Sequence, residues 1–378
     1  MIKNFDVVII GGGLAGLTAA IHLVKKHLNV LLIEKNEFPS HKVCGEYVSN
    51  EVLPYLKSLG FDPFKYGAKQ ITKLNLSGNN GQLIETDLPL GGFSISRYKF
   101  DYELLQLALK LGLKTQKDLV TQVQFNHDLF KISTKSKYEY KAKFVIGSFG
   151  KRSNLDVKLK RSFIKNKTPY VGVKGHYHGD FPNNIVGLHN FEGGYCGVSK
   201  IENNQLNICY ITDSKVFKLY KNFKEFEIKV LSRNEHLKSV LSNSSLSFKK
   251  PITISQVSFE SKKPVEEHIL MCGDSAGMIH PLAGNGMSMA IRSSQMISEN
   301  ILEFFSGNIK SRKKLESIYQ SNWKKEFNLR LKMSKLIEKV FNSNILSVVL
   351  ISLVKTFPFL LKKTILLTHG KTMRPSAF

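Results

Sequence analysis

The chain is poor in cysteine, tryptophan, proline and acidic residues. Its four cysteines, Cys44, Cys196, Cys209 and Cys272, lie far apart and form no CxxC pair, so the sequence indicates neither a disulfide framework nor a zinc site. This usage predicts reduced thiols and a cytoplasmic protein. With only 11 Pro and 27 Gly among 378 residues and 42% hydrophobic residues, the composition also disfavours fibrous and disordered chains.

Because acidic residues are few, the chain has a large positive net charge. Lys and Arg number 55 against 30 Asp and Glu, which gives a formal charge of +25 and a pI of about 9.7. Lysine is spread along the chain and arginine is scarce, which disfavours nucleic acid as a partner because phosphate and guanine recognition favours clustered arginine. A generally lysine-rich composition and attraction to an anionic membrane surface both remain as explanations.

Long hydrophobic runs are also missing. The apolar stretch 345–354 is broken by serines and is followed by Lys355 and Pro358, so it is too short to span a bilayer. Two interpretations of this segment stay open: a helical cap over a substrate cavity, and an anchor at the inner face of the membrane. The first residues run from an apolar stretch directly into glycines without a small-residue cleavage site, which does not predict a signal peptide.

The amino-terminal residues have the pattern of a dinucleotide-binding unit. A β-branched run at 7–10 precedes Gly11, Gly13 and Gly16, an apolar helical pattern follows, and a second apolar run at 30–33 ends at Glu34. Gly11 permits a tight turn, Gly13 leaves room for a pyrophosphate at a helix N-terminus, and Gly16 lets helix and strand pack closely. Glu34 can accept hydrogen bonds from a ribose.

A second glycine-rich segment lies far along the chain. A short buried strand is expected at 269–272, and it leads into the sequence GDSAGMIHPLAGNGMSMAIRSS at 273–294. Asp274 can bind a sugar-alcohol chain, while the following loop and helix start can place backbone N–H groups against a polar ring system.

Together, these blocks resemble the FAD-dependent oxidoreductases of the geranylgeranyl reductase and aromatic hydroxylase type. The sequences HKVCGEYVSNEVLPYLKSLG at 41–60 and ISRYKFDYELLQLA, with Arg97, extend the resemblance. It implies FAD as cofactor, with the first fingerprint on its ADP half, Asp274 on its ribityl chain and the 281–287 loop beside its isoalloxazine. The FAD-binding residues that the resemblance implies are Gly11, Gly13, Leu14, Ala15, Gly16, Glu34, Lys35, Cys44, Gly45, Arg97, Gly273, Asp274, Pro281, Gly284, Asn285, Gly286 and Met287.

The sequence departs from that family in two places. Phe149 replaces an acid that the family associates with NAD(P)H, which weakens the prediction of NADPH or NADH as electron donor and favours a donor protein. The stretch 193–211 contains Tyr195 but lacks the tryptophan of the polyprenyl reductases. The Trp-rich halogenase signature is also missing, because Trp323 is the only tryptophan and lies elsewhere.

Three residues are candidates for chemistry beside the flavin. Cys44 lies in a segment that passes near the ring in the resembled family, Tyr195 can face the ring from the substrate sheet, and His280 precedes Pro281 and can act as an acid. Each also has a structural interpretation, as inert packing or a hydrogen-bonded core residue. His176 and His178 alternate on one strand, but no third ligand accompanies them, so no metal site is predicted.

The predicted fold class is α/β, with a Rossmann-like, discontinuous FAD-binding domain, an inserted, mostly antiparallel β-sheet substrate domain and a C-terminal helical segment. The predicted boundaries are 1–65, 97–160 and 263–305 for the FAD-binding domain, 66–96 and 161–262 for the substrate domain, and 306–378 for the helical region.

The sequence therefore predicts an FAD-dependent oxidoreductase that acts on a hydrophobic or aromatic small molecule in secondary or lipid metabolism. Monooxygenation, as by a hydroxylase or epoxidase, is the leading reaction, and flavin-dependent reduction of a carbon–carbon double bond is its close competitor. A third alternative belongs to another class: a basic flavoprotein that binds RNA or a membrane without turning over a small molecule.

Overall fold

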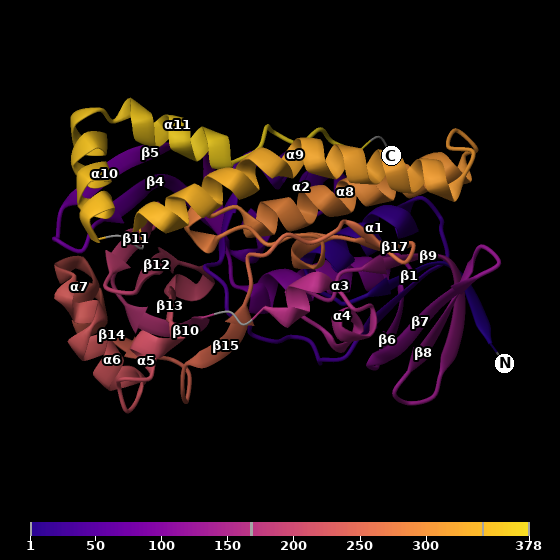
Figure 1. Ribbon diagram of the computed structural model, residues 1–378, viewed down its shortest axis with the longest axis horizontal. Coiled ribbons are helices and arrows are strands. Elements are labelled where there is room, and N and C mark those ends of the chain that lie inside the picture. The colour runs from indigo at the N-terminus through magenta and orange to yellow at the C-terminus, as the bar shows by residue number, and fades with distance from the viewer. Residues whose placement is uncertain (1, 167–168, 342–343, 377–378) are drawn as a thin grey trace.

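The computed structural model describes residues 2–166, 169–341 and 344–376. Its strands form two sheets that lie next to each other along the long axis, and the long helix α9 (Arg312–Phe341) runs across both of them (Figure 1). This arrangement confirms the predicted α/β class with a Rossmann-like part, a second sheet and C-terminal helices.

The first sheet holds the amino-terminal strand at its centre. Its strand order is β16-β17-β9-β1-β2-β6, and β7 and β8 extend it from β9. Strands β17, β9, β1, β2 and β6 run parallel, as in dinucleotide-binding folds. The bounds are β1 Lys3–Ile10, β2 Val30–Glu34, β6 Lys114–Lys117, β7 Val120–Asn126, β8 Leu129–Thr134, β9 Glu139–Gly147, β16 Val265–Glu266 and β17 Ile269–Met271.

The apolar runs in this sheet explain its burial. Residues 7–10 of β1 pair in register with residues 30–33 of β2, and every one of these eight side chains is at most 4% exposed. A parallel strand covered by helices on both faces needs such a continuous β-branched run. Each buried Val, Leu or Ile contributes roughly 1.5–3 kcal/mol, so the strand pair around the first turn is held firmly in place.

The second sheet is mostly antiparallel, as predicted, and its order is β14-β10-β13-β12-β11-β4-β5-β3, with β15 also pairing β10. One pairing, β4 with β11, is parallel. Tyr47–Ser49, which the sequence boundaries assign to the FAD-binding part, pairs with β5 in this sheet. The bounds are β3 Tyr47–Ser49, β4 Lys69–Ser77, β5 Leu83–Ser94, β10 Tyr170–Gly179, β11 Ile185–Phe191, β12 Gly194–Lys200, β13 Leu206–Asp213, β14 Ser244–Leu246 and β15 Ile252–Val257.

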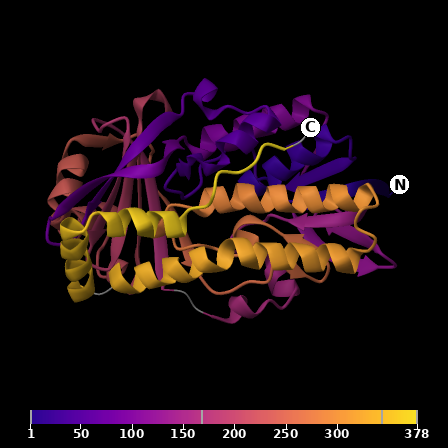
Figure 2. The same cartoon turned by 90° about the horizontal axis from the view of Figure 1, so that it is seen from above.

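Helices α1 and α8 pack together beside the first sheet, where Thr18 and Ser294 share a hydroxyl hydrogen bond of 2.6 Å. Helix α9 lies along α8 and continues towards the second sheet (Figure 2). The helix bounds are α1 Leu14–Lys25, α2 Leu53–Leu59, α3 Arg97–Lys110, α4 Asn154–Lys158, α5 Ser214–Phe217, α6 Phe223–Lys229, α7 Glu235–Ser242, α8 Gly286–Phe305, α9 Arg312–Phe341, α10 Asn344–Thr356 and α11 Phe359–Thr368.

The C-terminal helices fold back over β4 and β5, and the tail after α11 returns across the molecule (Figure 2). Within the described part of the chain, no single helix has the length and apolarity of a membrane span, although the bent pair of α9 and α10 meets those criteria together. Ile351, Val354, Leu361 and Ile365 pack against the second sheet in one apolar cluster. This placement agrees with the interpretation of the segment as a cap.

Buried histidines make the fold sensitive to acid. His22 of α1 is 1% exposed and lies beside Tyr55 and Ser376, and burial, reinforced by Lys26 and Lys25, lowers its pKa to about 4. The unfolded chain, with a histidine pKa of about 6.5, therefore binds the proton more readily than the folded protein.

We therefore expect the stability of the protein to fall as the pH drops from 6.5 to 4, with His22 alone contributing about 3 kcal/mol of that loss. Urea unfolding at several pH values measures it. His22→Gln should flatten the pH dependence in this window, whereas a replacement of the exposed His127 should leave it unchanged. An identical slope for His22→Gln and the native chain would contradict the assignment.

Candidate functional site

A cavity of about 1130 Å³ lies between the two sheets and beneath the C-terminal helices. Segments from widely separated parts of the sequence line it: the glycine turn after β1, the loop 41–47, the turn after β17 with the start of α8, and one face each of the second sheet and α9–α11. The cavity therefore has two halves, one made by the nucleotide-binding elements and one by the second sheet with its helical cover.

The glycine turn brings helix α1 against the first sheet. Gly11 has a φ of +108°, and a Cβ there would meet the Ser148 carbonyl oxygen at 2.4 Å. A Cβ on Gly16 would lie 2.0 Å from the carbonyl oxygen of Gly11. Side chains at these positions would push the helix off the strand, so the glycines fix the distance between α1 and the sheet.

The N-terminus of α1 faces the cavity without a side-chain cap. Gly13 is its N-cap, and the first turn contains no acidic residue. The nearest atoms to a Cβ on Gly13 would be Arg97 Nη2 at 3.6 Å and Lys42 Nζ at 3.9 Å. Free helix N–H groups, a bare glycine surface and two nearby cations form an arrangement that suits a bound phosphate group.

Asp101 holds the two cations in place. Its carboxylate accepts hydrogen bonds from Arg97 Nε and Nη2 at 2.7 and 2.8 Å and from Lys42 Nζ at 2.8 Å. Burial opposes the charge of Asp101, but Arg97 and Lys42 outweigh it and keep the carboxyl pKa below its usual value. The aspartate therefore orients Arg97 rather than contacting a ligand itself.

Glu34 ends β2 and lines the nucleotide half of the cavity. Its Oε2 accepts a 2.7 Å hydrogen bond from the Gly12 N–H, and its Oε1 accepts from the Asn36 N–H. These bonds hold the carboxylate at the position where the fingerprint places the ribose contact.

Asp274 follows β17 and lines the cavity, and its carboxylate makes no hydrogen bond to another residue in the described part of the chain. Burial raises its pKa, although Lys262, Arg97 and Lys151 oppose the shift. Lys262 donates to the backbone carbonyl of Asp274 at 2.6 Å, and burial lowers the pKa of this lysine to about 8. An acceptor without a protein partner at this position fits a polyhydroxyl chain.

The loop from Pro281 to Gly286 is fixed by helix α9. Arg330 of α9 donates to Asn285 Oδ1 at 3.2 Å, and Asn285 donates to Glu51 Oε1 at 3.1 Å. The Glu51 carboxylate also accepts a hydrogen bond from the backbone N–H of Gly370. Burial raises the pKa of Glu51 despite the neighbouring Arg330. The C-terminal region therefore anchors the loop that the resemblance places beside the isoalloxazine.

Cys44 lines the cavity at the junction of its two halves. Its thiol donates to the Met287 sulfur at 3.7 Å and accepts from the Glu46 N–H at 3.4 Å. Burial raises the pKa of Cys44, and Glu46 adds to the shift while Arg97 opposes it. The thiol therefore keeps its proton at neutral pH.

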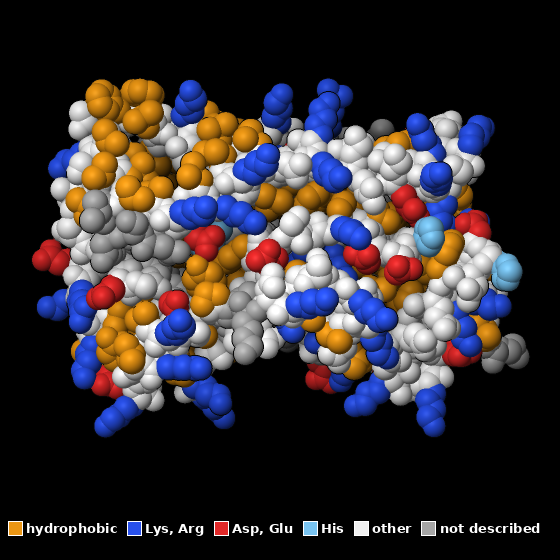
Figure 3. Space-filling view, viewed as in Figure 1, with side chains coloured by type: hydrophobic (Ala, Val, Ile, Leu, Met, Phe, Trp, Pro, Cys, Tyr) orange, Lys and Arg blue, Asp and Glu red, His pale blue; other side chains and the backbone are white. Residues whose placement is uncertain are grey.

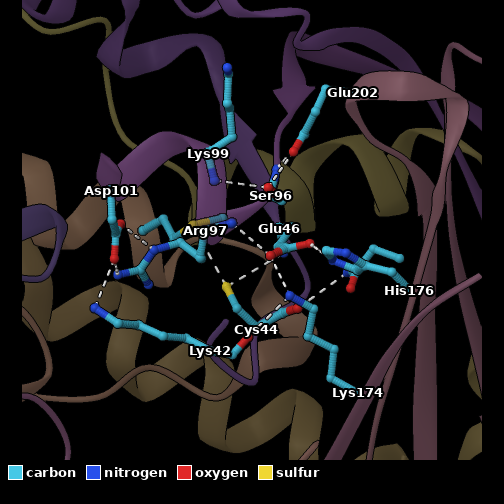
Figure 4. A network of polar contacts seen from close by, with 12 residues as sticks. Lys42, Cys44, Glu46, Ser96, Arg97, Lys99, Asp101, Lys174, His176 and Glu202 are labelled. Carbon is cyan, nitrogen blue, oxygen red and sulfur yellow. Dashed lines mark hydrogen bonds and ion pairs between the residues drawn. The ribbon is translucent and has the colours of Figure 1, made fainter. Parts of the chain in front are cut away.

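A buried charge cluster attaches the Cys44 loop to the second sheet (Figure 4). Glu46, Lys174 and His176 are each at most 2% exposed; Lys174 forms an ion pair with Glu46, and His176 Nε2 lies 2.8 Å from Glu46 Oε2. Lys174 also donates to the Lys42 carbonyl at 3.2 Å. Although burial opposes ionisation, Lys174 and His176 keep the pKa of Glu46 below its usual value.

The same carboxylate reaches helix α3. Glu46 Oε1 accepts a 2.7 Å hydrogen bond from the backbone N–H of Arg97. One buried carboxylate therefore links the phosphate-side arginine, the Cys44 loop and strand β10. His176, considered above as a metal ligand, has its ring nitrogen against Glu46, whereas His178 is exposed.

The two other catalytic candidates lie in different surroundings. Tyr195 of β12 lines the cavity, and burial raises its pKa well above the usual value. His280 is not among the described residues that line the cavity; its ring lies in an aromatic cluster with Tyr170, Tyr195 and Phe259. Burial lowers the pKa of His280 to about 3, so its ring is neutral rather than an imidazolium near pH 7.

The structure brings sixteen of the seventeen expected FAD-binding residues to the cavity wall, and Gly16 alone lies behind it as a packing glycine. Sequence reasoning missed Glu46, Lys174, Lys262 and Arg330. Glu46 lies inside the 41–60 block and could have been noticed there. The other three are charged residues whose burial depends on contacts between distant segments.

FAD, the cofactor that the resemblance implies, fits this wall. A helix N-terminus with Arg97 and Lys42 suits its diphosphate, Glu34 suits the adenosine ribose, and Asp274 suits the ribityl chain. The loop at Pro281–Gly286 and the Cys44 segment flank the place that remains for the ring.

Comparisons with known proteins agree with that fit. The family described as FAD dependent oxidoreductase matches residues 6–45. Digeranylgeranylglycerophospholipid reductase of Methanosarcina acetivorans is 25% identical over 354 residues, which cover 89% of this chain and 84% of that protein.

Solved structures share the fold over almost the whole chain. The flavin-dependent brominase Bmp2 has a TM-score of 0.80 at 18% identity and covers 97% of this chain and 94% of its own. PqsL of Pseudomonas aeruginosa, described as a probable FAD-dependent monooxygenase, has a TM-score of 0.75 at 13% identity. The match covers 91% of this chain and 98% of PqsL. The tryptophan of this chain, Trp323, packs against Phe327 of α9 and does not line the cavity in the described residues.

We expect Gly13→Val to abolish FAD binding, because the new side chain would occupy the space over the helix N-terminus without striking the protein. Flavin absorbance of the purified protein measures the loss. The cofactor-free variant should unfold at the same temperature as the cofactor-free native chain. Full flavin retention would show that the phosphate site lies elsewhere.

We expect Lys174→Met to destabilise the protein by about 3–5 kcal/mol, because it leaves the Glu46 carboxylate buried without its main cation. Urea unfolding provides the measurement, and Glu46→Gln combined with Lys174→Met should recover part of the loss. Lys73→Met, which breaks the exposed pair with Glu85, is the matched control and should cost about 1 kcal/mol or less. An equal loss of unfolding free energy in the Lys174→Met and Lys73→Met variants would contradict the role of the buried cluster.

Proposed function

We propose that this chain, an FAD-dependent oxidoreductase, acts on a bulky apolar or aromatic small molecule that lies in the second-sheet half of the cavity. The observation that carries the proposal is the contrast between the two halves. The charged lining residues belong to the nucleotide half and the loops around it, such as Glu34, Arg97 and Asp274. The lining residues from β4, β5, β11–β13, β15 and α9–α11 include no Asp, Glu, Lys or Arg in the part of the chain that the structure describes.

Aliphatic side chains dominate the second half. Leu76 of β4 and Leu188 of β11 form its floor, and Ile351 of α10 and Ile365 of α11 cover it. His369 also lines this part, but burial lowers its pKa to about 4, so its ring is neutral. A wall of this kind favours an apolar ligand, because a charged or strongly polar substrate would lose its hydration without gaining a partner.

FAD, when bound, supplies two-electron redox chemistry and, after its reduction, reactivity towards dioxygen. The chain supplies the surroundings. Arg97 and the α1 N-terminus would bind the diphosphate, Asn285 and Arg330 fix the loop that would lie at the ring, and the aliphatic cover shields the reaction space from water on the side of α10 and α11.

Monooxygenation is the reaction that we place first. An oxygen-transferring flavoenzyme needs a site that excludes water, and the aliphatic cover of α10 and α11 supplies one. The similarity in fold to a probable FAD-dependent monooxygenase over 91% of the chain is consistent with it.

Reduction of a carbon–carbon double bond is a second candidate, and a specific residue favours it. Such a reduction adds a hydride, which reduced flavin can supply, and a proton, and the Cys44 thiol holds a proton at the junction of the two halves. The relative from Methanosarcina acetivorans, whose name describes a reductase of an unsaturated lipid, supports the same candidate.

The mass of the product decides between these reactions. We expect lipid and aromatic extracts of cells with the gene to contain a compound one oxygen heavier than a precursor that accumulates in cells without it. A gain of two hydrogens would assign the reductase reaction instead. Identical extracts, combined with no turnover of any apolar compound by the flavin-loaded protein, would contradict the proposed substrate class.

A matched pair of variants links the product to the cavity. Leu188→Trp fills the second half and should remove the product while flavin absorbance is retained, because Leu188 lies on the second-sheet wall. Leu129→Trp introduces the same side chain at an exposed position of β8 and should leave product formation unchanged.

A further inference from the structure

The two helices that cover the cavity are apolar on both of their faces. Their inner face includes Ile351, Val354, Leu361 and Ile365, which are buried against the second sheet. Their outer face leaves large apolar side chains in solvent, and Figure 3 shows apolar side chains gathered at the corner of the molecule where α10 and α11 lie. The outer apolar residues are Val349, Leu353, Phe357, Phe359 and Leu366, with exposed fractions of 49%, 46%, 47%, 62% and 54%.

We name these five residues the outer patch. Val349, Leu353 and Phe357 are spaced by four, so they lie along one side of α10 and its end. Phe359 and Leu366 continue the surface on α11. Scattered apolar residues are normal on protein surfaces, but a contiguous group on neighbouring helices marks a binding surface.

The charged residues of the C-terminal stretch that carries the outer patch all have one sign. The stretch 339–378 contains no Asp or Glu, and its cations are Lys339, Lys355, Lys362, Lys363, Lys371 and Arg374. Lys355, Lys362 and Lys363 are exposed on the same two helices and form no ion pair with any residue in the described ranges.

From this combination we infer that the outer patch docks the protein on an anionic lipid bilayer. Apolar side chains of an interfacial helix enter the boundary between head groups and acyl chains, and lysines beside them contact the anionic head groups. A second copy of the chain fits this surface less well, because a symmetric interface would bring the lysines of α10 and α11 together with no acidic residue from the same stretch between them.

The position of the outer patch gives docking a consequence for the cavity. Leu353 in the patch and Val354 in the cavity wall are consecutive residues, so a single helix separates the bilayer from the second half of the cavity. A lipid-soluble substrate would then pass from the bilayer around α10 and α11 without crossing water. This delivery role rests on the proposed apolar substrate, whereas the docking itself does not.

Flotation of the FAD-loaded full chain with vesicles tests the inference. We expect binding to vesicles of phosphatidylcholine with phosphatidylglycerol and much weaker binding to phosphatidylcholine alone. High salt should reduce the binding, because it screens the attraction between lysines and head groups. Replacing Lys355, Lys362 and Lys363 together by Gln should weaken partitioning by roughly a hundredfold, at about fivefold per lysine.

The apolar part has its own matched variants. Leu353→Glu with Phe359→Glu should abolish flotation while flavin absorbance is retained. Leu219→Glu with Ile228→Glu changes two apolar residues near α5 and α6 that are 78% and 61% exposed, and these helices lie at the opposite edge of Figure 1, so flotation should stay unchanged.

Three outcomes would overturn the inference: no flotation of the native chain, equal binding to both kinds of vesicle, or equal loss in both variant pairs. Flotation absent in a protein that turns over an apolar substrate in detergent would refute docking and leave the proposed function intact. Flotation by a protein that turns over no apolar compound would support docking and refute the proposed substrate class. Binding of the patch to an acidic carrier protein, with no binding to vesicles, would identify another class of partner and also refute docking.

Discussion

The buried carboxylate of Glu46 sets how the two sheets meet. It accepts a hydrogen bond from the Arg97 backbone N–H on one side and pairs with Lys174 and His176 of β10 on the other. Charges this far from water are stable only when each has its partner, so small displacements of one sheet against the other are costly. The position of the cavity between the sheets, and of Cys44 two residues before Glu46, follows from this constraint.

The C-terminal region acts on the same cavity from the other side. Arg330, Asn285 and Glu51 hold the loop at the start of α8, while α10 and α11 close the apolar half. Polar contacts thus hold the nucleotide-side wall of the cavity, and apolar contacts form the wall of its second half. The two kinds of contact meet where Cys44 approaches Met287, at a thiol that keeps its proton.

The nucleotide half could be predicted from sequence because its requirements are local. The glycines at 11, 13 and 16 act through contacts within one turn, and the runs at 7–10 and 30–33 have to be strands buried on both faces. The cavity wall accordingly contains almost every residue expected there. The antiparallel character of the second sheet was also predictable from its short, alternating segments.

What could not be predicted depends on contacts between distant segments. Nothing near Lys174 in the sequence reveals that its side chain meets Glu46, which lies 128 positions earlier. The parallel pairing of β4 with β11 joins strands from two separate insertions. His280 was considered as an acid from its place beside Pro281, but the aromatic rings that bury it come from β10, β12 and the 259 region. Burial, and hence protonation, is set by those distant partners.

The tail after α11 also ties the helical cover to the nucleotide-binding half. Its residues return to the amino-terminal half, where Met373 donates a backbone hydrogen bond to the Glu51 carbonyl at 2.7 Å and Ser376 contacts both Ser58 and His22. The side chain of Glu51 accepts hydrogen bonds from Asn285, at the start of α8, and from Gly370, just after α11. The end of the cover and the loop before α8 therefore share one anchor. A displacement of α11 away from the second sheet would strain the contacts of that loop, so the two halves of the cavity are mechanically coupled.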